Sequence, residues 1–236
     1  MSIENEICTL TGANDVNESL FEMGLLRRID EPFSLVTISE WWRSGAETYS
    51  YIFDVKGDTT RRVILKACVA LVFGRSIDTV LDEWLKRRSM LESLDVATPT
   101  LFGHGNGTIL EEYIFLGLDD AFRRSSEPEA LASALGHVAA VFVYLGFRPN
   151  QPFHDMRSRG SDVVVIDFGE DLGSPNNPVT HEDLDCTLQQ LIASLEAWQL
   201  PKRPELEQVA CDSFWKVINS QSTNQRKGKY QSGASF

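Results

Sequence analysis

The sequence predicts a two-lobe α+β protein in which a strand-rich half precedes a helix-rich half. Three observations support this class. Segments of β-branched and aromatic residues separated by turn signals fill residues 34–117, segments of helical periodicity follow them, and 236 residues suffice for two small domains. We expect a helical extension over residues 1–33, a first lobe over 34–117, a second lobe over 118–222 and a flexible tail over 223–236.

Strands are expected to form most of the first lobe. Residues 34–42 and 48–55 are rich in β-branched and aromatic residues on either side of a small-residue turn, and residues 62–69 complete an antiparallel meander. Residues 96–102 and 108–114 flank an Asn-Gly turn, which predicts a second hairpin. Together these segments predict a five-stranded antiparallel sheet.

Helices are expected on this sheet and throughout the second lobe. Apolar residues recur at helical spacing over residues 78–94, with charged residues on the other face, so this helix should pack on the sheet. The predicted helices of the second lobe span residues 128–144, 180–199 and 204–220. Between the first two of these, residues 161–166 form an apolar run typical of a buried strand.

Charge and composition exclude several kinds of partner. The chain has 22 Lys and Arg against 34 Asp and Glu, a formal net charge of −12, which repels nucleic-acid backbones and anionic lipid. We therefore expect neither nucleic acid nor a membrane surface as a partner. The four cysteines lack C-x-x-C spacing, which argues against a zinc site. The acidic N-terminus is unlike a secretory signal, so we expect a cytoplasmic protein.

A lysine in an apolar strand is the first candidate for chemistry. Lys66 follows the apolar residues 63–65, and a buried ammonium group is costly unless a carboxylate compensates it. The next predicted helix offers Glu83 and, further on, Glu92. The alternative that needs no partner is a Lys66 side chain that reaches solvent from an edge strand.

An aspartate directly after a buried strand is the second candidate. Asp167-Phe168-Gly169 follows the apolar run at residues 161–166. A carboxylate is a preferred ligand of hard cations such as Mg²⁺. In a chain this acidic, a polyanionic ligand would need such a metal or a local cationic pocket to offset its charge.

The order of these segments resembles the protein-kinase-like fold, and within it the short aminoglycoside and small-molecule phosphotransferases more than the eukaryotic protein kinases. The resemblance rests on the small-residue turn at Gly45-Ala46, the strand that ends in Lys66 and the strand that runs into Asp167. It implies ATP and Mg²⁺ as cofactors, bound between the two lobes. It also implies that the backbone of Gly45 and Ala46 covers the phosphates, and that Lys66 reaches them.

The resemblance assigns the remaining cofactor contacts as well. Thr98-Pro99 is similar to the loop that follows this helix in the phosphotransferases, and counting back from it favours Glu83 as the carboxylate that holds Lys66. Asp167 would ligate the metal. Main-chain groups near Glu112 and Ile114 would hydrogen-bond to adenine.

The catalytic loop departs from the family pattern, which has His-x-Asp, an Asn five residues later and a hairpin before Asp-Phe-Gly. One alignment takes His154-Asp155-Met156 as the triplet, which makes Asp155 the catalytic base but leaves only 12 residues to Asp167. The other takes residues 153–156 as the first strand of the hairpin, turning at residues 157–160. Under that alignment no aspartate base exists.

The two alignments imply two functions. The first implies an ATP- and Mg²⁺-dependent phosphotransferase that transfers the γ-phosphoryl group to a hydroxyl group of a small molecule or a protein. The second implies a pseudokinase that acts as a nucleotide-binding or ATP-free regulatory protein, because a positioned general base contributes about 10²–10⁴ in rate. We expect Lys66 and Asp155 to be the catalytic residues of the active form.

Overall fold

The computed structural model describes residues 34–44, 48–56, 60–68, 76–105, 107–148, 153–169, 172, 179–199 and 202–231. The chain divides into two compact units, which we call the sheet unit (residues 1–87 and 99–113) and the helical unit (residues 88–98 and 114–236). The mixed α+β class is confirmed. The predicted helical extension over residues 1–33 and the turn residues Gly45 and Ala46 lie outside the described residues.

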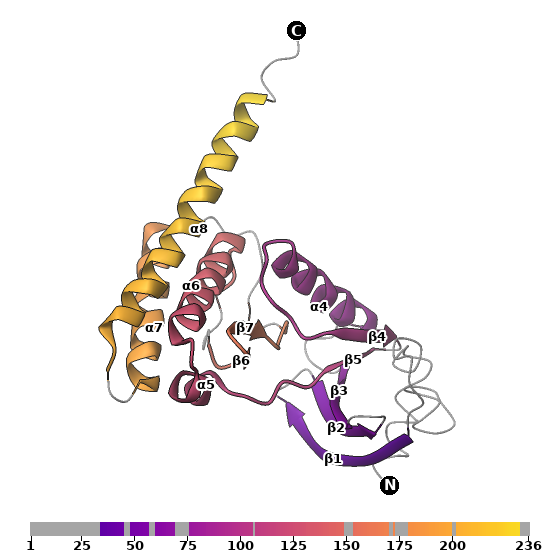
Figure 1. The fold of residues 1–236 in the computed structure, drawn as a ribbon. Coiled ribbons are helices and arrows are strands. Elements are labelled where there is room, and N and C mark those ends of the chain that lie inside the picture. The colour runs from indigo at the N-terminus through magenta and orange to yellow at the C-terminus, as the bar shows by residue number, and fades with distance from the viewer. Residues whose placement is uncertain are drawn as a thin grey trace. The chain divides into compact units, whose positions relative to one another are not determined.

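An antiparallel sheet with the strand order β1-β2-β3-β5-β4 dominates the sheet unit (Figure 1). Its strands are β1 (Ser34–Ser44), β2 (Thr48–Lys56), β3 (Thr60–Cys68), β4 (Leu101–Gly105) and β5 (Thr108–Glu112). The predicted meander of the first three strands is confirmed. Because β3 lies between β2 and β5, Lys66 belongs to an interior strand, and the alternative of an edge-strand lysine is wrong.

The strand predicted over residues 96–102 begins later than expected, at Leu101. Pro99 has no amide hydrogen to give to a ladder, which disfavours a strand through it. The residues before Pro99 pair elsewhere, because the carbonyl oxygen of Ala97 accepts a hydrogen bond of 3.0 Å from the amide of Val165 in the helical unit. The strand is therefore confined to the segment after the proline.

The helix α4 (Ile77–Glu92) begins in the sheet unit, and the boundary between the units falls after its residue Arg87. Ser76 precedes it and caps its first turn, since the Ser76 hydroxyl accepts a hydrogen bond of 3.2 Å from the amide of Thr79. Leu81, Trp84 and Leu91 are buried, as the apolar periodicity of the predicted helix requires.

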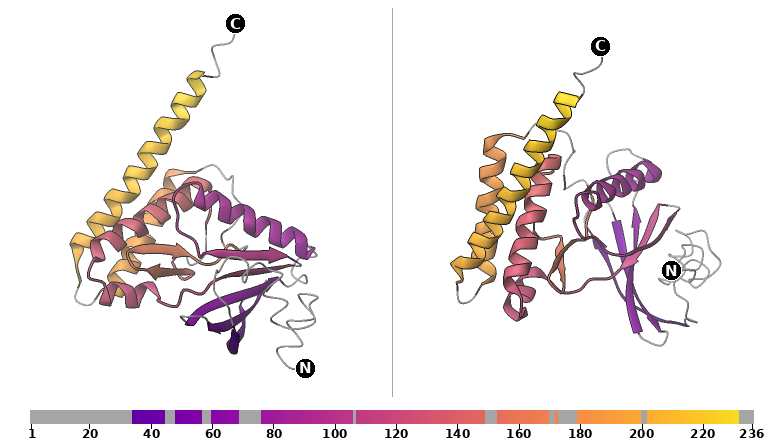
Figure 2. Two further views of the ribbon diagram at one scale, coloured as in Figure 1. Left: turned by 45° about the vertical axis from the view of Figure 1, so that its right-hand side comes forward. Right: turned by 45° about the horizontal axis from the view of Figure 1, so that its top comes forward.

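The helical unit contains α5 (Leu118–Arg124), α6 (Pro128–Leu145), α7 (His181–Trp198) and α8 (Pro204–Gln231). Figures 1 and 2 show α6, α7 and α8 lying side by side, with α8 continuing beyond the other two. The helix predicted to end at residue 220 thus extends to Gln231, into the segment predicted as a tail. Residues 221–231 contain no proline and several good helix formers, which permits this extension.

The packing of α6 against α8 depends on Gly136. A Cβ atom at this position would lie 2.0 Å from the carbonyl oxygen of Ala210 on α8, closer than any real contact. The absence of a side chain therefore allows the two backbones to approach directly.

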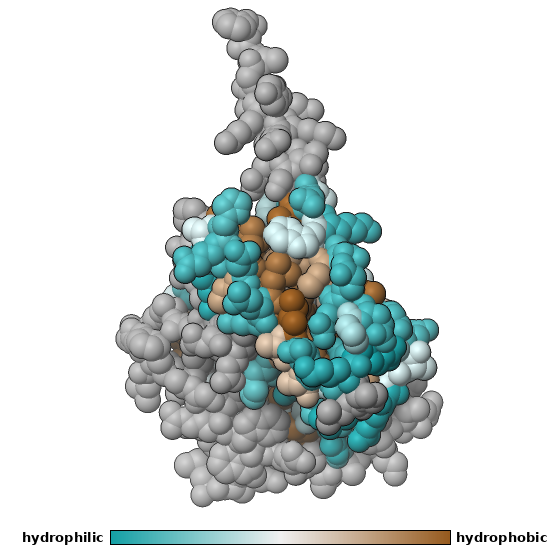
Figure 3. All heavy atoms as spheres, turned by 90° about the vertical axis from the view of Figure 1, so that its left-hand side faces the viewer, coloured by the Kyte–Doolittle hydropathy of each residue, from teal (hydrophilic) through white to brown (hydrophobic). Residues whose placement is uncertain are grey.

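Figure 3 views the helical unit from the side of α7 and α8, where apolar side chains form a narrow band between hydrophilic ones.

Among the described residues, α6 alone is long and apolar enough to span a membrane. Its 18-residue window is 61% buried inside the protein, and its apolar face packs in the core of the helical unit.

A short hairpin completes the helical unit, formed by β6 (Met156–Arg159) and β7 (Asp162–Val165). Its register pairs Met156 with Val165 at one end and Arg159 with Asp162 at the other. Gly160 occupies the turn with φ of 65°, a left-handed conformation that glycine adopts without strain. The predicted buried strand before Asp167 is confirmed as β7.

Candidate functional site

Lys66 lies on β3 with its side chain almost fully buried. The residue is 8% exposed, and its Nζ atom is 2.6 Å from Oε1 of Glu111, whose side chain is 2% exposed. The register pairs Lys66 with Ile109, so Glu111, two residues further along β5, lies on the same face of the sheet. The ammonium group also lies over the indole ring of Trp84, 5.8 Å from Nζ to the ring centre. Burial of this lysine is therefore compensated by a buried carboxylate.

The carboxylate at Lys66 was predicted to be Glu83, and sequence reasoning missed Glu111. Glu83 lies on α4 with its side chain 40% exposed, and one of its oxygens is 3.7 Å from the guanidinium of Arg87. A role for Glu83 in holding Lys66 stays a prediction. Glu111 could have been found by pairing the predicted strands, because alternation along β5 places it on the face of Ile109 and away from Glu112.

The segment after β5 contains the main-chain groups predicted to contact adenine. The amide of Glu112 is already used, since it donates to the carbonyl oxygen of Thr100 at 2.9 Å. The carboxylate of Glu112 accepts from the amide and the hydroxyl of Thr100, at 3.1 and 3.0 Å. By contrast, neither backbone group of Ile114 makes a hydrogen bond within the part of the chain that the structure describes. Ile114 therefore keeps a donor and an acceptor for a planar ligand, and Glu112 does not keep its donor.

In the helical unit, the β6–β7 hairpin can be compared with the two alignments proposed for the catalytic loop. The hairpin is present, as the second alignment requires, but its first strand begins at Met156, and its turn is at Gly160. Asp155 is the residue directly before β6. No residues therefore remain between Asp155 and the hairpin for the loop that normally follows a catalytic aspartate.

The same geometry brings Asp155 and Asp167 to one end of the hairpin. Met156 pairs with Val165, and the amide of Ile166 donates to the carbonyl oxygen of Asp155 at 3.0 Å, which extends the ladder by one step. Asp167 follows directly. Oδ1 of Asp167 accepts a hydrogen bond of 2.9 Å from the amide of Gly169, which leaves Oδ2 without a partner among the described residues.

The carboxylate of Asp155 lies next to a histidine at this end of the hairpin. The Asp155 side chain is 36% exposed, and its Oδ1 is 3.3 Å from Nδ1 of His154. The described residues contain no cluster of three or more metal-ligating side chains. Asp155 and Asp167 each bring one carboxylate to this end of the hairpin, and two carboxylates are fewer ligands than a metal site built from protein groups alone requires.

Phe168 lies between Asp167 and Gly169, and its buried ring packs against Arg88, a residue that sequence reasoning missed. The guanidinium of Arg88 lies 5.6 Å from the ring centre of Phe168. Its Nε donates to Oε1 of Glu92 at 2.8 Å, and its Nη2 donates to the hydroxyl of Thr98 at 2.9 Å. Arg88 follows Leu81 and Trp84 at helical spacing, so its position on the apolar face of α4 was a signal in the sequence.

Comparison with known proteins adds no family to this description. A scan against models of known protein families finds no match, and no curated protein sequence matches the chain significantly.

Proposed function

We propose that this protein is an ATP- and Mg²⁺-dependent phosphotransferase of kinase-like fold that acts in the cytoplasm and transfers the γ-phosphoryl group to a hydroxyl group of a small molecule or a protein. One observation carries the proposal: a hairpin with Asp155 and Asp167 at the same end. The buried Lys66–Glu111 pair of the sheet unit supports it.

Asp167 fits Mg²⁺ that arrives with the nucleotide. Mg²⁺ in such sites is usually held by one or two carboxylates together with phosphate oxygens and water. Asp167 has a carboxylate oxygen available for the metal, and the partly exposed Asp155 is left to accept the proton of the acceptor. When bound, the metal neutralises the charge that develops on the phosphates. The proposal therefore expects nucleotide binding to require Mg²⁺.

Lys66 is proposed to contact the phosphates. Its pairing with Glu111 holds the long side chain in one position before any ligand arrives, which reduces the entropy lost on binding. The free backbone groups of Ile114 are proposed to hydrogen-bond to the adenine ring. The transfer itself forms a bond between the acceptor oxygen and the γ-phosphorus, while the bond from that phosphorus to the β–γ bridging oxygen breaks and ADP leaves. The acceptor proton goes to the Asp155 carboxylate.

A second candidate function is a nucleotide-binding pseudokinase that regulates a partner. The observation that favours it is the absence of residues between Asp155 and β6, because Asp155 in this position is suited to hold metal and less suited to accept a proton. In this case the protein binds Mg²⁺-ATP and transfers no phosphate.

Thermal unfolding with ATP, with and without Mg²⁺, tests both candidates. A ligand present at 100 times its Kd stabilises the folded state by about 2.7 kcal/mol, so wild type should show a clear rise in Tm with Mg²⁺-ATP. Lys66→Ala and Asp167→Asn should lose this rise. Asp162→Asn, at the opposite end of the hairpin, is the matched control and should keep it. If Mg²⁺-ATP leaves the Tm of wild type unchanged, both candidates are wrong, and an ATP-free interaction protein remains.

Asp155→Asn separates the enzyme from the pseudokinase. For the enzyme, transfer of labelled γ-phosphate to hydroxyl acceptors should fall by about 10²-fold or more, with the Kd for Mg²⁺-ATP changed little. For the pseudokinase, wild type should transfer no label, and Asp155→Asn should weaken binding of Mg²⁺-ATP and leave binding of metal-free ATP unchanged.

A further inference from the structure

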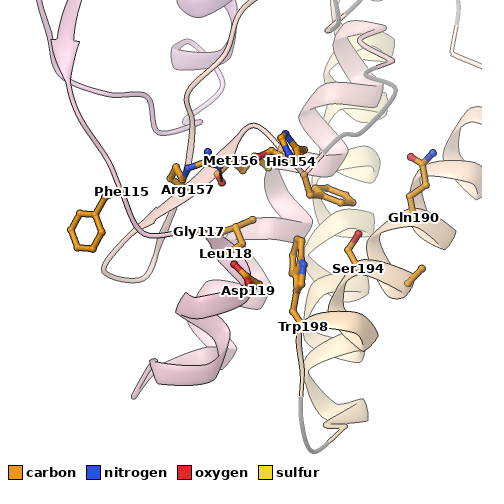
Figure 4. Close-up of a pocket in the computed structure, with 12 residues that line it drawn as sticks. Phe115, Gly117, Leu118, Asp119, His154, Met156, Arg157, Gln190, Ser194 and Trp198 are labelled. Atoms are coloured by element: carbon orange, nitrogen blue, oxygen red, sulfur yellow. Dashed lines mark hydrogen bonds between the residues drawn. The ribbon is translucent and has the colours of Figure 1, made fainter. Parts of the chain in front are cut away.

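The helical unit contains a cavity that the proposed function does not use. Its volume is about 670 Å³, within the range of small-molecule sites. It lies between the start of α5, the strand β6 and one face of α7 (Figure 4). The described residues that line it are Phe115, Gly117, Leu118, Asp119, Phe153, His154, Met156, Arg157, Gln190, Ala193, Ser194 and Trp198.

Aromatic side chains provide the apolar wall of this cavity. Trp198 stacks on Phe122, with ring centres 5.9 Å apart, and meets Phe153 edge-on at 6.3 Å, so its ring is fixed from two sides. Phe115 lies at the edge of the cavity and is 77% exposed, the largest exposure of any large apolar residue in the described chain. A flat apolar ligand would cover these rings, and aromatic contacts of this kind add stabilisation beyond the buried area.

The cation in the cavity has no carboxylate partner among the described residues. Arg157 is the one Arg or Lys among the described lining residues. Its Nη1 donates to the carbonyl oxygens of His154 and Met156, both at 2.8 Å, which fixes the guanidinium against β6. No carboxylate of the described residues pairs with it, whereas Asp119 is paired with Arg123 at 3.3 Å. In a chain with a net charge of −12, an arginine that has no carboxylate partner in the described chain and lines the same cavity as aromatic rings indicates an anionic ligand.

Further polar groups along the cavity have no partner in the described chain. They are Nη2 of Arg157, Nε2 of His154, the side-chain amide of Gln190, the hydroxyl of Ser194 and the indole nitrogen of Trp198. Figure 4 shows Gln190, Ser194 and Trp198 along α7, with His154 and Arg157 across from them on the hairpin side. Most of these groups are donors, and they match the acceptor oxygens of a carboxylate.

We propose that this cavity binds a small aromatic carboxylate, with its ring against Trp198 and Phe153 and its carboxylate on the guanidinium of Arg157. The planar guanidinium suits a carboxylate because it offers parallel N–H donors. A neutral ring system would leave the cation unpaired, and an ammonium group would be repelled by it. This proposal is independent of whether the chain transfers phosphate.

Three probes with one ring system test the charge requirement. Naphthalene-2-carboxylate, naphthalene-2-methanol and naphthalene-2-methylamine present the same bicyclic ring with a negative, neutral or positive group. Ligand-observed NMR titrations give a Kd for each with the full-length protein. We expect the carboxylate to bind at least about tenfold more tightly than the alcohol, which corresponds to one charge-assisted hydrogen bond, and the amine to bind most weakly.

Variants then locate the binding. Arg157→Gln should reduce the affinity for the carboxylate to that for the alcohol and leave the affinity for the alcohol unchanged. Arg159→Gln, two residues along the same strand, is the matched control. Trp198→Leu should reduce the affinities for the carboxylate and the alcohol alike. Trp215→Leu, at a partly exposed tryptophan of α8, should change neither affinity. Because Trp198 supports the core, Ser194→Leu is a second test, since it fills the cavity without removing the aromatic wall.

Each outcome decides the proposal. Saturable binding of the carboxylate that is lost in Arg157→Gln and Ser194→Leu supports it. The proposal is overturned if no probe binds wild type saturably, if the alcohol binds as tightly as the carboxylate, or if Arg157→Gln and Arg159→Gln behave alike.

Discussion

Each unit contains a buried cationic side chain, and the groups that compensate the charge differ between the two units. In the sheet unit, the ammonium of Lys66 is 2.6 Å from a carboxylate of Glu111 that is itself buried. In the helical unit, the guanidinium of Arg88 contacts Glu92, whose side chain is 45% exposed, the hydroxyl of Thr98 and the ring of Phe168. The first cation is thus held by an opposite charge away from water, and the second by a half-exposed carboxylate, a hydroxyl group and a buried aromatic ring.

The chemistry of the two side chains explains this difference. An ammonium group is a compact charge that favours a single carboxylate, whereas a guanidinium is planar, more weakly hydrated and stacks on aromatic rings. A buried ion pair is costly to break, because one charge is left behind in a medium of low dielectric. The comparison therefore predicts that the sheet unit is the more sensitive of the two to loss of one partner.

The largest effect is expected from Glu111→Gln. It removes the buried carboxylate at Lys66 and should lower the free energy of unfolding by about 3 kcal/mol. Glu83→Gln, which changes a carboxylate that is 40% exposed, should cost less than about 1 kcal/mol. Urea unfolding of the two variants measures both values. An equal loss for the two would show that Glu83 compensates Lys66 as much as Glu111 does.

A double variant checks the cause of this loss. Lys66→Met combined with Glu111→Leu replaces the ion pair by apolar side chains of similar size, and such replacements are often neutral for stability. We expect the double variant to be more stable than Glu111→Gln. If it is less stable than the single variant, then the sheet unit loses stability through packing and the buried charge is not the cause.

A smaller effect is expected from Arg88→Met in the helical unit. The substitution keeps an apolar side chain against Phe168 but removes the hydrogen bonds to Glu92 and Thr98, so the free energy of unfolding should fall by about 2 kcal/mol. Arg88→Lys should recover only part of this loss, because an ammonium cannot reproduce the fork of the guanidinium. A loss for Arg88→Met larger than that for Glu111→Gln would reverse the comparison between the units.

The elements of both units were largely predictable from the sequence, since local patterns determine them. The alternation over β2, the helical periodicity of α4 and Pro128 at the start of α6 each depend on residues that are close along the chain. The extension of α8 to Gln231 was not predicted, because polar helix formers without an apolar stripe resemble a solvated tail. The start of β4 was missed because it depends on where Ala97 pairs, which is a tertiary contact.

The candidate site was predictable only in part, for the same reason. Lys66 and Asp167 were identified from their strands, whereas Glu111 depends on the register between β3 and β5. The position of Asp155 beside Ile166 depends on where the hairpin begins, and the sequence left two alignments open at that point. The sequence did not distinguish Arg157 from its neighbour Arg159, because whether an arginine has a carboxylate partner depends on tertiary contacts.

The smallest effect concerns pH and compares one aspartate in each unit. In the sheet unit, a hydrogen bond from the side chain of Arg62 holds the pKa of Asp54 below its usual value of 3.8. In the helical unit, hydrogen bonds from the hydroxyl and the backbone amide of Thr180, together with Arg148, lower the pKa of Asp183. Each aspartate faces an arginine at similar exposure, but Asp183 also completes the capping box at the start of α7.

The direction of the pH effect follows from these lowered pKa values. A carboxyl group whose pKa is lower in the folded state stabilises the fold above its unfolded pKa, and this contribution is lost as the pH falls through the folded value. The stability advantage of wild type over Asp183→Asn should therefore be constant near pH 6, at less than about 1 kcal/mol, and shrink below about pH 4. Tm values measured from pH 6 to about pH 2.5 test this, with Asp54→Asn as the comparison. Because Asp54 is not part of a cap, the stability advantage of wild type over Asp54→Asn should be smaller than that over Asp183→Asn at every pH. Equal advantages over the two variants would assign the whole effect to the arginines.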